Sequence, residues 1–305
     1  AIIYSVLKIH GGFSGSLAEL AEVSDPAASS VPGVFASFFG PDPAGLAGVI
    51  LLTSLGTWGL PQMVQKFYSI KSEQSIHTGT IISTLFAIIV AGGCYFLGGF
   101  GRIFNVDVAS KGYDEIIPTM LSNLSPLIIG ITLILVLSAS MSTLSSLVLT
   151  SSSTLTLDFI VPLSKRKDEK KTLIIIRAFI LVFIIISAVI AVIQYKNKIT
   201  FIAQLMGLSW GALAGSFLAP FLYSLYWKKV TKSACAVSFI WGSGIMIANM
   251  LFGSHFPTII QSPVNCGAFA MLASLVIVPV VSLITKKPEK KFVDDIFSCY
   301  DRKVT

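Results

Sequence analysis

Long apolar runs separated by short polar stretches dominate the chain. Seven of them have about the 20 apolar residues that a helix needs to span a bilayer. They lie at about 44–70, 79–100, 126–159, 172–195, 199–227, 233–252 and 263–285, and a short helical piece is expected at 113–124. A shorter run at 1–10 precedes a loop rich in glycine and proline at about 11–43. The pattern predicts an all-α membrane protein with about seven full transmembrane helices and a partial one.

Composition supports the same class. The chain is 54% hydrophobic and 12% charged, whereas soluble domains are about 25% charged. It opens without Met inside an apolar run that has about half the length of a membrane span. We therefore expect residues 1–285 to be the C-terminal part of a longer transmembrane domain, truncated at its N-terminal side, and residues 286–305 to be a cytoplasmic tail.

The basic residues indicate a membrane orientation. Sixteen of them lie in the loops 62–78, 164–171 and 228–232 and in the tail, whereas the alternate loops hold four. Positive residues favour the cytoplasmic side, so the first set and the C-terminus should be cytoplasmic and the 11–43 loop external. Although the net charge is +7, the basic residues form short clusters between apolar runs, and we expect no nucleic-acid partner.

A helix-weakening stretch interrupts the first predicted span, where Gly56, Gly59 and Pro61 follow one another closely. Non-helical backbone at membrane depth occurs where it is buried in protein or lines a cavity. Transporters use such broken helices to bind ions and substrates. The alternative is a structural kink, since glycine and proline are common in membrane helices. Trp58, beside the break, would contact a substrate or pack in the core.

Hydroxyl side chains crowd the apolar run at 126–159. Small and hydroxyl residues recur there at helical spacing on one face, namely Ala139, Ser142, Thr143, Ser146 and Thr150. Such residues let membrane helices pack closely and hydrogen-bond to one another. They also offer the oxygen ligands that hard cations select. The spacing alone leaves both interpretations open.

Residues suited to catalysis or proton transfer are scarce. His10, His77 and His255 share no metal-ligand spacing, and the four cysteines are expected to fill apolar positions. Ionisable residues inside the spans are almost absent, since Arg177 and Asp158 lie near span ends. The sequence therefore predicts that the protein is not an enzyme.

Two motifs resemble those of the sodium:solute symporter family, which includes proline, pantothenate and sialic acid transporters. One is Gly59-Leu60-Pro61, followed by Lys66 and Phe67. The other is the run Ala-Ser-Met-Ser-Thr-Leu-Ser at 139–145, followed by Ser152, Ser153 and Asp158. The resemblance implies an inverted-repeat fold of 5+5 helices in which most of the first repeat would precede residue 1.

This resemblance also implies functional roles. The Ala139 carbonyl and the Ser142 and Thr143 hydroxyls would ligate sodium, and Ser145 and Ser146 match a second sodium site of some members. The remaining ligands would come from N-terminal helices of the same protein that are missing here. The residues expected to line the substrate cavity are Thr53, Thr57, Trp58 and Pro61.

The implied activity is sodium-coupled symport of a small organic solute through the cell membrane by alternating access, with Na+ as coupling ion. Amino-acid, pantothenate and monocarboxylate types of solute all remain open. The alternative is a non-transporting membrane sensor or channel of the same fold.

Overall fold

The computed structural model describes residues 2–25, 29–67, 70–106, 112–164, 168–197 and 202–301. Helices dominate these ranges, and the only β structure within them is an isolated bridge between Asp25 and Ser29. The chain divides into two compact units, one of residues 1–15 with 104–201 and one of residues 16–103 with 202–305. The predicted all-α class is confirmed.

Six helices in the described ranges are long and apolar enough to cross a membrane. They confirm a multi-pass membrane protein. The predicted span at 44–70 is interrupted: α3 (Pro43–Ser54) and α4 (Pro61–Phe67) are separated by a 3-10 segment (Gly56–Gly59). The span predicted from residue 79 begins earlier, at Glu73, because Ser72 caps it by accepting a hydrogen bond from the Ser75 amide.

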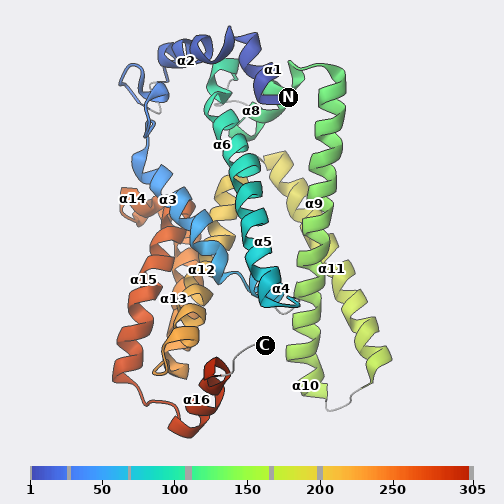
Figure 1. Cartoon of the computed structure of the whole chain (residues 1–305), viewed down its shortest axis with the longest axis vertical. Helices are drawn as coiled ribbons and strands as arrows, with labels where there is room; N and C mark the ends of the chain where they lie inside the picture. The colour runs from blue at the N-terminus through green and yellow to red at the C-terminus, as the bar shows by residue number, and fades with distance from the viewer. Residues whose placement is uncertain are drawn as a thin grey trace. The chain divides into compact units, whose positions relative to one another are not determined.

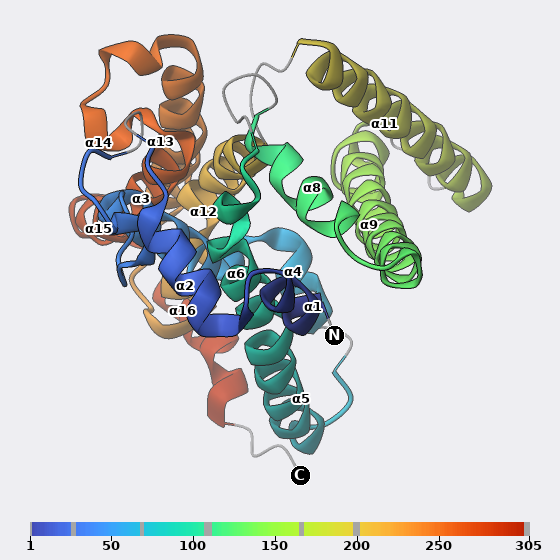
Figure 2. The same ribbon diagram turned by 90° about the horizontal axis from the view of Figure 1, so that it is seen from above.

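The first unit contains two long helices that pack side by side, α9 (Pro126–Thr154) and α11 (Glu169–Asn197), as Figures 1 and 2 show. A π-helical segment (Leu155–Ile160) joins α9 to α10 (Val161–Ser164). The unit also holds α1 (Ile2–Ile9), a 3-10 turn (Tyr113–Glu115) and α8 (Ile116–Ser122). Pro126 occupies the first position of α9, where its fixed φ suits a helix and its missing N–H is not needed.

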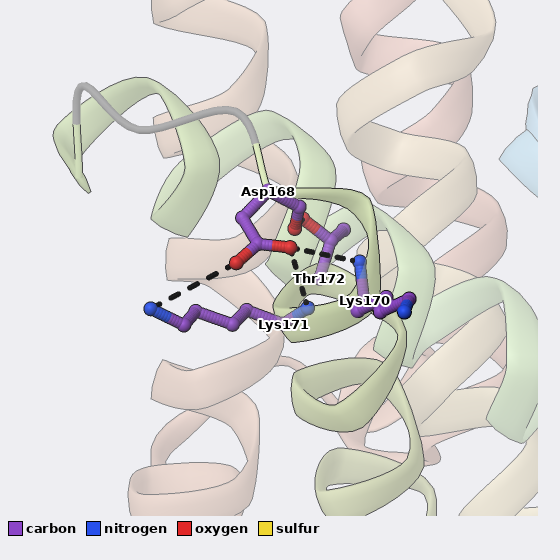
Figure 3. Close-up of polar contacts among 4 residues, drawn as sticks. All are labelled: Asp168, Lys170, Lys171 and Thr172. Atoms are coloured by element: carbon purple, nitrogen blue, oxygen red, sulfur yellow. Dashed lines mark hydrogen bonds and ion pairs between the residues drawn. The ribbon is translucent and has the colours of Figure 1, made fainter.

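Asp168 caps the start of α11 (Figure 3). Its Oδ1 accepts hydrogen bonds from the backbone amides of Lys170 at 3.1 Å and Lys171 at 3.4 Å. The Thr172 hydroxyl donates to the Asp168 carbonyl at 3.0 Å. A carboxylate stabilises the positive end of a helix dipole. This cap explains why α11 begins a few residues before the apolar run predicted from 172.

The second unit is built on three mutually packed helices, α12 (Ile202–Tyr226), α13 (Lys232–Phe252) and α15 (Pro263–Ile284). Helix α3 packs on α15 beside them (Figure 1). The remaining helices are α2 (Gly12–Glu22), which begins in the first unit, α5 (Glu73–Phe86), α6 (Gly92–Gly99), α14 (Thr258–Gln261) and α16 (Lys290–Phe297). A π-helical segment (Ala87–Ala91) joins α5 to α6.

Glycines at four-residue spacing on α12 allow the backbones of the three helices to pack closely. A Cβ added to Gly211 would lie 2.5 Å from the Cα of Gly267 on α15. One added to Gly207 would lie 2.8 Å from the backbone nitrogen of Val264, and one on Gly215 would lie 3.1 Å from the Cα of Gly242. Small residues at this spacing let membrane helices approach backbone to backbone. This glycine stripe was not predicted from the sequence.

Polar side chains tie the same three helices together. The Trp241 indole N–H donates to the Ala270 carbonyl at 3.0 Å, and the Tyr223 hydroxyl donates to the Leu275 carbonyl at 2.8 Å. The buried Ser238 hydroxyl donates to the Ser216 carbonyl at 3.0 Å. Each polar group finds an acceptor inside the bundle, which removes the cost of leaving it unpaired in an apolar environment.

Two predicted non-helical regions contain helices. The prediction of a loop at 11–43 is wrong for its first third, because α2 begins at Gly12. Gly11 and Gly12 have φ values of 77° and 86° where the chain turns into this helix. The tail beyond residue 285, expected only as a charged segment, holds α16. The basic residues Lys111, Lys165, Arg166, Lys167, Lys198, Arg302 and Lys303, which contributed to the orientation prediction, lie outside the described residues.

Candidate functional site

The predicted helix break is present between α3 and α4. Helix α3 ends at Ser54, the backbone continues as a 3-10 segment, and Leu60 is extended at φ −82° and ψ 118°. Pro61 then begins α4. Proline fits the first turn of a helix but cannot continue one that precedes it. The sequence therefore ends one helix and starts another within the stretch predicted to span the membrane.

The break packs tightly on α12. A Cβ added to Gly59 would lie 2.9 Å from the backbone nitrogen and the Cα of Leu218. Gly56 and Leu60 are buried, and Leu52, one turn before the break, belongs to a buried cluster with Ala214, Leu218, Val264 and Met271. The backbone of residue 59 lies directly against the backbone of Leu218 and leaves no room for a Cβ. Only glycine at position 59 therefore allows this close approach. The irregular backbone is thus buried in protein, as non-helical segments at membrane depth must be.

At the break, two backbone oxygens accept no hydrogen bond from the part of the chain that the structure describes. Leu60 donates to the Thr57 carbonyl at 3.3 Å, and Met63 donates to the Leu60 carbonyl at 2.9 Å. Between these bonds, no described residue donates to the carbonyls of Trp58 or Gly59. Pro61 explains why the Trp58 carbonyl lacks a hydrogen bond. In a continued 3-10 helix the amide of residue 61 would donate to that carbonyl, and proline has no N–H. The lone pairs of such a carbonyl can accept a hydrogen bond or coordinate a hard cation.

Side chains at the break differ in their freedom. The Thr53 hydroxyl donates to the Val49 carbonyl at 2.7 Å, and the Thr57 hydroxyl donates to the Ser54 carbonyl at 3.2 Å. Trp58 is 60% exposed, so in this unit it does not pack in the core. Pro61 is half-buried. The structure thus brings the four predicted substrate residues together on one short segment, and their role in substrate binding stays a prediction.

The predicted sodium residues lie on an uninterrupted stretch of α9. Ala139, Ser142, Thr143, Ser145 and Ser146 are all exposed within the first unit. The Ala139 carbonyl faces the Thr143 amide in the regular i to i+4 pattern of the helix. A carbonyl oxygen has two lone pairs, so this bond leaves one for a further partner. The ligand set needs no break in α9.

The hydroxyls on α9 fall into two groups. Those of Ser145 and Ser146 donate to the carbonyls of Met141 at 2.7 Å and Thr143 at 2.8 Å. Ser152, Ser153 and Thr156 bond back to their own helix in the same way. In contrast, the Ser142 and Thr143 hydroxyls have no hydrogen bond among the described residues, and the same holds for Ser138, Ser140, Ser151 and Thr154. Of these, Ser142, Thr143 and Thr154 share a helix face with Ala139, and only Ser142 and Thr143 lie within about one turn of it, since Thr154 is about four turns away.

The α9 hydroxyls and the backbone carbonyls at the α3–α4 break are all neutral oxygen ligands. The described residues contain no group of three or more His, Cys, Asp or Glu side chains that would hold a transition metal. Asp158, in the π-helical segment, is exposed and lies about three turns beyond Ser146, the last of the predicted sodium residues. Hydroxyl and carbonyl oxygens suit a hard cation. The unpartnered carbonyls at Trp58 and Gly59 were not predicted as individual ligands, although Pro61 was a sequence signal for them.

Comparison with known proteins gives consistent matches. The profile of the "Sodium:solute symporter family" matches residues 2–242. The chain is 29% identical to the osmoregulated proline transporter of Bacillus subtilis (strain 168) over 80% of this chain and 50% of that protein. It is 29% identical to a sodium/proline symporter of Staphylococcus aureus, over 79% and 48% of the two chains. It is 28% identical to the sodium/pantothenate symporter of Haemophilus influenzae, over 76% and 47%. The chain spans about half the length of the curated relatives it matches.

Proposed function

Because the chain belongs to the sodium:solute symporter family, we propose that the protein couples the inward movement of sodium to the uptake of a small organic solute. Relatives named as a sodium/proline symporter and a sodium/pantothenate symporter support this coupling. In this proposal the protein is a membrane transporter and not an enzyme. Proline is the first solute to test, because two of the relatives above are named for it.

The sodium site that we propose uses the Ala139 carbonyl and the Ser142 and Thr143 hydroxyls of α9. The observation that carries it is that these two hydroxyls share a face with Ala139 and have no hydrogen bond among the described residues, whereas Ser145 and Ser146 bond back to the helix. An unbonded hydroxyl can turn its lone pairs toward an ion without breaking an existing bond. Three ligands on one helix do not surround an ion, so at least one further segment supplies oxygens.

Ser145 and Ser146 are proposed as ligands of a second sodium. Their bonds to the Met141 and Thr143 carbonyls use the hydroxyl proton and leave the oxygen lone pairs free. The proton then points at the helix and away from an approaching cation. The back-bonded geometry is therefore compatible with ligation.

The solute is proposed to bind at the break between α3 and α4. The carbonyls of Trp58 and Gly59, which accept no hydrogen bond from a described residue, would supply acceptors for an amine or hydroxyl of the solute. The hydroxyls of Thr53 and Thr57 and the exposed Trp58 ring would complete the lining around Pro61. Broken helices supply solute contacts of this kind in other transporters.

Alternating access is the proposed mechanism, with sodium binding from outside and both ligands released inward. The C-terminus would then be cytoplasmic, as the distribution of basic residues favours. Each sodium that moves down 100 mV supplies about 2.3 kcal/mol. At about 1.4 kcal/mol for a tenfold ratio, one ion supports a solute gradient of about fiftyfold.

The test is uptake of labelled proline and pantothenate by the full-length protein in proteoliposomes, with and without a sodium gradient. Ser142→Ala and Thr143→Ala should each raise the sodium concentration for half-maximal uptake several-fold. Ser140→Ala is the matched control, because its hydroxyl is also exposed and unbonded but lies about 100° around the helix from Ala139. The control should leave sodium dependence unchanged.

Unchanged sodium dependence in Ser142→Ala and Thr143→Ala would overturn the site. Sodium-independent uptake would overturn the coupling. A sodium current without saturable solute uptake would favour a channel, and solute binding without transport would favour a sensor.

A further inference from the structure

Helix α16 follows the end of α15 after a short connection and has two distinct sides. Its apolar residues, Phe292, Val293, Ile296 and Phe297, fall within an arc of about 140° when eight residues are placed at 3.6 per turn. Lys290, Lys291, Asp294 and Asp295 occupy the rest of the circumference. The helix is therefore amphipathic, in contrast to the uniformly apolar spans that precede it.

One edge of α16 is attached to the end of α12. The Lys228 Nζ lies 3.0 Å from Asp294 Oδ1 and 5.3 Å from the centroid of the Phe297 ring. Just beyond α16, the Tyr300 hydroxyl donates to the Leu225 carbonyl at 2.9 Å. A cleft of about 520 Å³ lies between the two elements, and no residue of α16, all of which is described, is buried. The helix is thus held at the rim of the unit and does not belong to its core.

The opposite edge of α16 is uncovered. Phe292 is 62% exposed and Ile296 is 52% exposed, and their four-residue spacing places them on the same face. Asp294 and Phe297, which contact Lys228, lie on the other side of the helix. Two large apolar side chains on one face of an amphipathic helix are typical of segments that lie in a membrane interface.

The surroundings of α16 fit the surface of a bilayer. Helix α12 ends, α13 begins and α15 ends at this end of the second unit (Figure 1). The connecting residues 227–232 and the segment 285–297 hold seven lysines and three acidic residues. Tyr226, 76% exposed, is a residue type that concentrates at membrane–water interfaces. Excess lysine beside a membrane helix attracts anionic headgroups.

We propose that α16 lies on the adjacent leaflet of the membrane, with Phe292 and Ile296 inserted at the boundary between headgroups and acyl chains. Lys286, Lys287, Lys290 and Lys291 contact anionic lipid headgroups. Lipid is the partner that the observations favour, because α15 ends only a few residues before α16 and holds it beside the bilayer at high effective concentration. The Lys228–Asp294 pair fixes which face of the helix is turned to the lipid.

The experiment measures depth in the membrane. Phe292→Cys and Lys290→Cys, which lie about 160° apart around the helix, are made in the full-length protein with its native cysteines replaced by alanine, spin-labelled and placed in nanodiscs of phosphatidylcholine with or without phosphatidylglycerol. The ratio of collision with oxygen to collision with a water-soluble nickel complex should be several-fold higher at 292 than at 290. Replacing Lys286, Lys287 and Lys291 by glutamine, or raising the salt, should lower the ratio at 292 in the anionic discs.

Equal ratios at both positions would overturn the proposal, because the helix would then lie in water. Protection of position 292 from both reagents would also overturn it in favour of a protein partner or a second copy. Hydrogen exchange of the α16 amides in the native chain provides a measurement without substitutions. It should be several-fold slower in anionic than in neutral discs, and equal rates would contradict the proposal. Neither readout depends on transport.

Discussion

Gly211 on α12 and Gly267 on α15 place two transmembrane backbones in direct contact, since a Cβ on Gly211 would lie 2.5 Å from the Gly267 Cα. The same added carbon would lie 3.0 Å from the Met246 side chain of α13. The three helices of the second unit therefore meet at one point that has no room for a methyl group. This core supports the break between α3 and α4, because Leu218 and Ala214 of α12 contact it.

Gly211→Ala should destabilise the full-length protein by about 1–3 kcal/mol, the usual cost of overpacking. Backbone atoms of Gly267 cannot move aside as a flexible side chain would. The measurement is thermal unfolding in detergent micelles. Gly244→Ala on α13 is the control, because nothing lies within 4 Å of its added Cβ. Equal melting temperatures for the two variants would show that α12 and α15 separate without cost.

Pro61→Ala should weaken solute binding. Alanine restores the N–H that can bond to the Trp58 carbonyl, so the acceptor proposed for the solute would be engaged by the protein itself. Since a net hydrogen bond contributes about 0.5–1.5 kcal/mol, the solute concentration for half-maximal uptake should rise about two- to tenfold.

Pro43→Ala is the matched control for this change. Pro43 also begins a helix, but it follows a loop, and the Asp42 side chain caps the first turn by accepting from the Gly45 amide. Its substitution should leave uptake unchanged. If both variants weakened solute uptake equally, the cause would be the loss of a proline at a helix start and not the new hydrogen bond to the Trp58 carbonyl.

Ser145→Ala and Ser146→Ala should lower the Hill coefficient of sodium activation toward one, because each removes an oxygen of the proposed second site. The measurement is uptake against sodium concentration at saturating solute. Ser153→Ala is the control, since its hydroxyl bonds back to the Leu149 carbonyl at 2.8 Å in the same manner. A coefficient of one in the unsubstituted protein would mean that a single sodium is coupled.

Arg102→Gln should destabilise the second unit by about 1 kcal/mol or more, because partly buried charged hydrogen bonds are stronger than exposed pairs. Its guanidinium pairs with Asp25 and lies 4.4 Å from the centroid of the Phe35 ring. The control is Lys171→Gln, which removes an ion pair whose two side chains are 71% and 46% exposed. If thermal unfolding showed the same small change for both variants, the Arg102–Asp25 pair would stabilise the second unit no more than an exposed ion pair does.

Several features followed from local sequence alone. Apolar runs of membrane length are sufficient to specify helices, because backbone groups in lipid must bond within their own segment. Pro61 after Gly56 and Gly59 predicted where a helix would be interrupted, and the break is present there. The periodicity of hydroxyls placed Ala139, Ser142 and Thr143 on one face of α9. Helix α2 was missed because a glycine-rich start suggests a loop when its packing is unknown.

Contacts between distant segments required the tertiary structure. Local pattern could not show that Gly59 faces Leu218, or that Gly211 faces Gly267, because a glycine's role depends on which backbone lies opposite. Nor could it separate the α9 hydroxyls that bond back to their helix from those left free, because rotamers depend on surroundings. The sequence by itself thus determined a membrane-embedded helical chain with a broken span. The tertiary structure decided which of its hydroxyl and carbonyl oxygens form hydrogen bonds with other described residues.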